Sequence, residues 1–215
     1  MPSKIEPSKQ LYEFLNGAYA NFNQNLFENR LPNCVIVLHR NKGAAGYFWQ
    51  DAWSERREGQ YGPFQRTHEI ALNPDCFRTQ TTTEIMQTLV HEMCHLEQAI
   101  YGNPSRTGYH NAEWAAMMEA VGLIPSDTGL PGGKRTGQRM SDYPAPGGRF
   151  ERECQIYVDV LEFKVPWQAE TDERPNAASK RASKTKYICP ECNSKAWAKP
   201  ETKLICGECE VPLLC

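Results

Sequence analysis

The sequence predicts an α+β protein with a small metal-binding module near its C-terminus. Two long segments carry apolar residues at three- and four-residue spacings, as amphipathic helices do. Several short runs are rich in β-branched and aromatic residues, which favour strands. Two Cys-x-x-Cys pairs lie thirteen residues apart near the C-terminus, a pattern typical of zinc sites.

The first half of the chain is expected to form one helix and three strands. Residues 8–28 predict an amphipathic helix, because one face collects Leu11, Phe14, Leu15, Ala18, Tyr19, Phe22 and Leu26. The β-branched and aromatic runs predict strands at residues 34–40, 46–53 and 68–72.

The second half begins with a clear helix signal. Thr81 and Glu84 have the spacing of a capping box, so we expect a helix from there to Tyr101, ended by Gly102. A further helix is expected at residues 111–121. Residues 126–152 are rich in glycine and proline and predict largely irregular structure, and residues 154–163 read as a late strand.

Composition indicates a cytoplasmic location. The start of the chain lacks the apolar stretch of a signal peptide, and no apolar run reaches the roughly 20 residues that cross a bilayer. The nine cysteines are an odd number, which argues against a disulfide framework. Those outside the two pairs are expected to be free thiols: Cys34, Cys76, Cys94, Cys154 and Cys215.

These features predict a catalytic domain at residues 1–165, a basic linker at 166–186 and a zinc ribbon at 187–215. The net charge is −2, but residues 174–186 hold five cations and no acid, which leaves −7 for the rest of the chain. A basic segment of this kind suggests an anionic partner, although solvated linkers are often basic for no further reason.

The expected helix at 81–101 carries His91-Glu92-Met93-Cys94-His95. Residues four apart share one helix face, so His91 and His95 can aim two imidazoles at a single ion. Glu92 lies beside them, where it can serve as a general base. This His-Glu-x-x-His pattern is typical of zinc peptidases, and the alternative is a surface helix with two unrelated histidines.

A catalytic zinc ion needs a third protein ligand. An extended motif with His at position 101 is excluded, because the chain has Gln98 and Tyr101 there. His110, just before the next helix, is the preferred candidate, and Glu113 or Glu119 is the competing carboxylate. The other two histidines, His39 and His68, are expected to be structural.

The chain resembles the SprT-like family of zinc metallopeptidases over roughly residues 10–125. The resemblance is carried by the motif at 91–95, by His110-Asn111-Ala112-Glu113-Trp114, and upstream by Asn21-Phe22-Asn23, Leu31-Pro32, Gly46-Tyr47-Phe48 and Ile70-Ala71-Leu72-Asn73-Pro74. The family includes the eukaryotic protease Spartan, which degrades proteins crosslinked to DNA. Bacterial members also carry a C-terminal zinc ribbon, so a bacterial or mobile-element type is expected.

The resemblance implies a zincin-like fold, a third zinc ligand at His110 and a catalytic acid/base at Glu92. It also implies that a substrate strand bonds along the edge of the sheet. One position departs from the family, which usually has Gly where this chain has Asn111. We expect Asn111 to tolerate the backbone angle that a glycine would permit.

The second expected metal site is structural. Four thiolates bind zinc tetrahedrally and leave no open position. The candidate ligands are Cys189, Cys192, Cys206 and Cys209.

We therefore expect a zinc-dependent endopeptidase with one catalytic and one structural zinc ion, acting on proteins that are DNA-associated or DNA-crosslinked. The alternatives are a non-enzymatic nucleic-acid-binding adaptor and a zinc hydrolase of a non-peptide amide. DNA contacts are expected at Lys180, Arg181, Lys184 and Lys186, and no membrane partner is expected.

Overall fold

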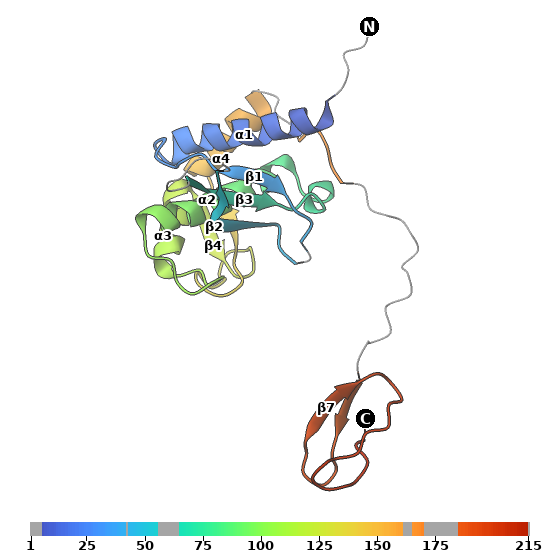
Figure 1. Cartoon of the computed structure of the whole chain (residues 1–215). Coiled ribbons are helices and arrows are strands. Elements are labelled where there is room, and N and C mark those ends of the chain that lie inside the picture. Colours follow the sequence, from blue (N-terminus) through green and yellow to red (C-terminus); the bar gives the residue numbers. More distant parts are fainter. Residues whose placement is uncertain (1–5, 42, 56–64, 161–164, 170–184, 215) are drawn as a thin grey trace. The chain divides into compact units, whose positions relative to one another are not determined.

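The computed structural model describes residues 6–41, 43–55, 65–160, 165–169 and 185–214. The chain divides into two compact units, Met1–Glu170 and Thr171–Cys215 (Figure 1). The larger unit is a mixed α+β structure, and the smaller contains a β-hairpin with four cysteines. No helix in the described ranges is long and apolar enough to cross a membrane.

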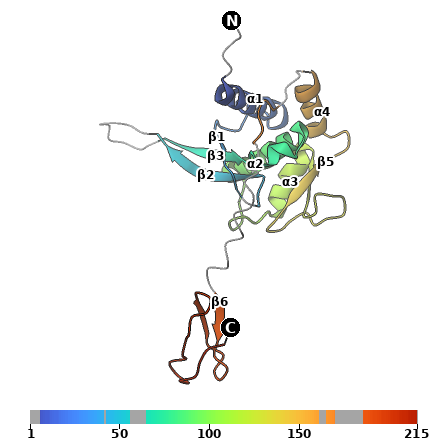
Figure 2. The same cartoon turned by 90° about the vertical axis from the view of Figure 1, so that its right-hand side faces the viewer.

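The larger unit is built on a three-stranded sheet. The strands are β1 (Val35–Leu38), β2 (Gly46–Ser54) and β3 (Arg66–Leu72), in the order β1-β3-β2. β1 runs parallel to β3, and β2 runs antiparallel to it, which leaves β2 at one edge (Figure 2). All three predicted strands are therefore confirmed, with bounds that differ by one or two residues.

Two long helices pack on one face of this sheet. α1 (Pro7–Leu26) runs along the sheet, and α2 (Thr82–Tyr101) follows the short helix η1 (Cys76–Arg78) (Figure 1). Their apolar faces meet Ile36, Ile70 and Leu72 in one buried core, whose burial stabilises the fold.

The predicted capping box at the start of α2 is confirmed. The Thr81 hydroxyl accepts from the Glu84 backbone N–H at 3.2 Å, and the Glu84 carboxylate accepts from the Thr81 N–H at 2.6 Å. Both bonds satisfy backbone amide groups that a helix end leaves free, so neighbouring residues determine where α2 begins.

A second layer lies beside α2. α3 (Ala112–Val121) ends at Gly122, which has φ of 93° and continues directly into β4 (Leu123–Ser126). β4 pairs antiparallel with β5 (Ser141–Pro144), so the hairpin lies against α3 (Figure 2). The expectation that residues 126–152 are largely irregular is therefore wrong in part. The two paired strands are separated by fourteen residues along the chain, with no local signal to reveal the pairing.

The strand expected at residues 154–163 is wrong. These residues are helical in α4 (Arg149–Gln155) and the single π-helical turn η2 (Ile156–Val160), and 161–163 fall outside the described ranges. Phe150, Cys154 and Tyr157 are buried at helical spacing, and Phe150 stacks on Phe22 of α1 at a centroid distance of 5.9 Å. Packing against α1 thus outweighs the β-propensity of this apolar run.

The smaller unit is a hairpin of β6 (Thr185–Ile188) and β7 (Lys195–Ala198), followed by a loop that returns to it through an Ile188–Leu214 bridge. Most of the expected basic linker, including Lys180, Arg181 and Lys184, lies outside the described residues. Lys186 is described, and it is exposed on β6 opposite Trp197.

Candidate metal centre

Three histidines converge at the interface of α2 and α3. His91 and His95 lie one turn apart on α2, and His110 precedes the first residue of α3 by two positions. One nitrogen of each ring lies within 4.8 Å of one nitrogen of the others. The structure thus brings together the three histidines that the sequence analysis singled out.

Trp114 in the first turn of α3 forms the wall behind these histidines. Its fully buried indole lies 4.9 Å from His91, 5.2 Å from His95 and 4.4 Å from His110, measured between ring centroids. It stacks on His95 with an interplanar angle of 21°. The rigid wall limits the rotamers available to all three imidazoles.

Two of the histidines are held by hydrogen bonds that the sequence analysis did not foresee. The Nδ1 atom of His91 lies 2.8 Å from a carboxylate oxygen of Asp142 in β5, and Nδ1 of His110 lies 3.2 Å from the Gly137 carbonyl. Both acceptors come from the segment expected to be irregular. Asp142 is one of three acidic residues in this glycine- and proline-rich stretch, so the sequence alone did not single it out.

The electrostatics of the cluster suit a metal ion. Burial lowers the pKa of His95 well below its usual range. Burial and the nearby charge of His91 lower the pKa of His110 to about 4. Burial also lowers the pKa of His91, but the hydrogen bond to Asp142 and the charges of Glu92 and Asp142 raise it by more. His95 and His110 are therefore neutral at pH 7 and each has a lone pair for a cation, so this donor set fits zinc.

Glu92 lies beside the histidines with its side chain buried. Burial raises its pKa to about 7, against the opposing charge of His91, and Asp142 adds to the increase. A carboxylate in this range can both take up and release a proton near neutral pH. A cation held by the histidines would lower this pKa and favour the ionised form.

The other sequence candidates are engaged elsewhere. Glu113 accepts from the Asn103 backbone N–H and from Gln98, each at 2.7 Å, and Glu119 forms a bidentate pair with Arg135. His39 contacts the Tyr47 ring edge-on, and His68 packs near Phe48. None of these four belongs to the histidine cluster in the described part of the chain.

Asn111 does not adopt the backbone angle that a glycine would permit, so its expected tolerance of that angle is not tested. Its φ of −89° is ordinary, and it serves as the N-cap of α3, accepting from the Trp114 backbone N–H at 2.9 Å. It also accepts from Gln98 and donates to the Asn103 carbonyl. Asn is preferred at such a cap, so this residue ties the loop before α3 to α2.

The four paired cysteines form the second candidate metal site. Sγ atoms of Cys189, Cys192, Cys206 and Cys209 all lie within 4.8 Å of one another. Each Cys-x-x-Cys pair is followed by a residue in the left-handed region, Asn193 at φ 58° and Glu210 at φ 54°. Four thiol groups so arranged are consistent with a zinc ribbon.

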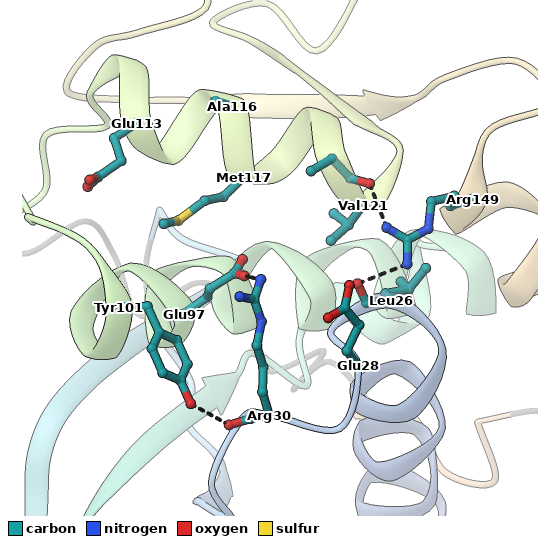
Figure 3. Close-up of a pocket in the computed structure, with 11 residues that line it drawn as sticks. Leu26, Glu28, Arg30, Glu97, Tyr101, Glu113, Ala116, Met117, Val121 and Arg149 are labelled. Carbon is teal, nitrogen blue, oxygen red and sulfur yellow. Dashed lines mark hydrogen bonds and ion pairs between the residues drawn. The ribbon is translucent and has the colours of Figure 1, made fainter.

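A cavity of about 450 Å³ lies on another side of α2, among α2, α3 and the turn after α1 (Figure 3). Most of the polar side chains that line this cavity have partners. Arg30 pairs with Glu97, Tyr101 donates to the Arg30 carbonyl, and Arg149 donates to the carbonyls of Asn25, Leu26 and Ala120. These bonds fasten the turn after α1 to α2, and they fasten α4 to the C-terminal ends of α1 and α3, so these residues have a structural role without a ligand.

Comparison with known proteins identifies related sequences. Residues 15–132 match the SprT-like family. A stretch of 41 residues is 46% identical to an uncharacterized protein in the mucB 3′ region of Salmonella typhimurium. This stretch covers 19% of this chain and 55% of that protein. The chain thus spans about half the length of the curated relative it matches. No solved structure matches the chain.

Proposed function

The chain belongs to the SprT-like family, and from this membership we propose that it is a zinc-dependent metallopeptidase with a zincin-like fold that hydrolyses peptide bonds in proteins. The observation that carries the proposal is the convergence of His91, His95 and His110 beside the buried carboxylate of Glu92. A site that served only to stabilise the fold would have no use for a base at this position.

In this proposal the three histidines hold the ion, and each residue around them has a defined task. When bound, zinc would polarise the peptide carbonyl and lower the pKa of a water molecule. Glu92 would take the proton from the attacking water and deliver it to the leaving amine. Trp114 and Asn111 would keep His110 in place at the start of α3.

The sheet edge next to Glu92 supports a protein substrate. Among the described residues β2 pairs only with β3, so its other edge has backbone groups free to bond an extended peptide. Gly46 at the start of β2 approaches Glu92 closely, which joins this edge to the proposed base. Recognition through backbone bonds would make selectivity for sequence weak.

We further propose that the four-cysteine site binds a structural zinc ion and that DNA is a partner. Support for DNA comes from the cations of residues 174–186 and from Lys186, which lies exposed opposite the exposed Trp197. Cations neutralise phosphates, and an aromatic ring offers a surface for base stacking.

The test is incubation of zinc-loaded protein with candidate protein substrates, with and without DNA, beside the Glu92→Gln variant. Cleavage by the parent and not by the variant would support a metallopeptidase. Binding of nucleic acid without cleavage of any substrate would favour the adaptor. Hydrolysis confined to small non-peptide amides would favour the other class of zinc hydrolase.

A further inference from the structure

We propose that Asp142 is a positioning residue, held in place by Gln87, that orients His91 so that its Nε2 atom faces the metal ion. The inference rests on the proposed zinc site at the histidines. Both Asp142 and the second acceptor, the Gly137 carbonyl, lie beyond residue 132, where the match to the family ends. They therefore belong to a part of the chain that the family match does not describe.

Asp142 is tied to α2 at two points. Its carboxylate Oδ2 lies 2.8 Å from Nδ1 of His91, and its backbone carbonyl accepts from Nε2 of Gln87 at 2.8 Å. Gln87, His91 and His95 are four residues apart in turn, so they form one stripe along α2. Gln87 lies one helical turn before His91 and holds the backbone of Asp142 in β5. This contact keeps the Asp142 carboxylate within reach of His91.

The hydrogen bond decides which ring nitrogen is available to an ion. A carboxylate can only accept, so Nδ1 of His91 must carry the proton that it donates to Asp142. The lone pair of the neutral ring is then on Nε2, which is the atom left to bind a cation. The same reasoning applies to His110, whose Nδ1 faces the Gly137 carbonyl.

The cost of burying Asp142 points to a role beyond the stability of the fold. Its side chain is about 5% exposed, and its second oxygen, Oδ1, is buried with no hydrogen-bond partner among the described residues. An incompletely paired buried carboxylate destabilises a fold. A cation on the far side of the His91 ring would offset this cost, as in other sites where a carboxylate supports a metal-binding histidine.

The experiment measures zinc affinity at the histidines by chelator competition, in full-length protein whose four-cysteine site serves as an internal reference. Asp142→Asn, which preserves shape, and Asp142→Ala should each weaken binding by roughly 10- to 100-fold. Gln87→Ala should weaken it less, because the carboxylate is kept while its anchor is lost. Cobalt-substituted protein should show a changed visible absorption spectrum in the Asp142 variants, which a purely structural role would not produce.

The matched control is Asp127→Asn, the same chemical change in an exposed residue of the same segment. Asp127 accepts from the Lys134 backbone N–H at 2.8 Å and does not contact the histidines, so this variant should bind zinc as the parent does. Undiminished affinity and an unchanged cobalt spectrum in Asp142→Asn would overturn the role of Asp142. If the parent takes up no metal at the histidines, the proposed function fails as well, so the two failures are distinguishable.

Discussion

The backbone of Gly46 lies against the carboxylate of Glu92. A Cβ atom at position 46 would come within 3.0 Å of Glu92 Oε1 and within 2.9 Å of both the Ala71 carbonyl oxygen and Thr88 Cγ2. Real Cβ contacts are almost never so short, and the Ala71 carbonyl is fixed in β3 and cannot yield. Glycine is thus required here for close approach, and the start of the edge strand fixes where Glu92 lies.

We expect Gly46→Ala to lower peptidase activity by roughly 10²-fold, because small displacements of a reacting group cost that much. Crowding should also reduce the free energy of unfolding by about 1–3 kcal/mol. The histidines are not touched, so zinc content should stay at the parental value. Activity assays beside elemental analysis check this, and a fully active variant would show that Glu92 does not depend on this contact.

The Glu92→Gln variant should keep zinc and fold but lose turnover. Gln is nearly isosteric and cannot accept a proton from water, and removal of a general base typically costs ~10²–10⁴-fold. The measurement is the initial rate of protein cleavage at equal zinc occupancy. Should the variant cleave as fast as the parent, Glu92 is not the general base.

Two zinc ions per chain are expected, with different sensitivity to chelators. Four thiolates fill every coordination position of zinc at the four-cysteine site, whereas three neutral imidazoles leave one coordination position open at the histidine site. Mild chelation should remove one ion and leave one, by elemental analysis. Cys192→Ser should lose the ribbon zinc and retain zinc at the histidines. A content of one ion or less in unchelated protein contradicts this expectation.

The parts of the fold that the sequence predicted well are those with local causes. The capping box between Thr81 and Glu84 and the four-residue spacing of His91 and His95 depend only on neighbours along one helix. His110 is separated from His95 by a loop, so the residues alone left Glu113 and Glu119 as alternatives, and the family resemblance was needed to choose.

The parts that were missed depend on contacts between distant segments. Asp142 reaches His91 only because β5 pairs with β4, and nothing in the composition of residues 126–152 reveals that pairing. In residues 154–163 the apolar run is compatible with a strand or a helix, and only its packing against α1 decides.

The contact between α1 and α4 allows a direct test of whether these two helices pack against each other. Phe150→Ala should reduce the free energy of unfolding by about 3–5 kcal/mol, because the ring is fully buried against Phe22. Ile156→Ala is the control, since Ile156 is 50% exposed and should change stability by no more than about 0.5 kcal/mol. Urea denaturation followed by fluorescence measures both, and equal effects would argue against this helical packing.

The last prediction concerns DNA. If the cations of residues 174–186 contact phosphates, binding should weaken steeply with salt, since each neutralised phosphate releases a counterion. Five contacts give a slope of log affinity against log salt of about −3.5 on single strands and about −4.5 on duplex. Stacking by Tyr187 or Trp197 would add ~1–3 kcal/mol per base and favour single strands. Of these two rings, Trp197 is exposed and Tyr187 is buried, so Trp197 is the better placed.

Replacing Lys180, Arg181, Lys184 and Lys186 with Gln should weaken DNA binding and flatten this slope, and should remove any stimulation of proteolysis by DNA.

The control makes the same change in charge at four exposed cations of the larger unit: Lys9, Arg40, Arg66 and Arg78. That variant should keep the slope, because the residues outside 174–186 carry a net −7 and are repelled by phosphate as a whole. Equal losses in both variants would mean that net charge, and not this segment, governs binding. Absence of salt-sensitive binding by the parent at low ionic strength would leave the segment as a tether, with substrates selected by another route.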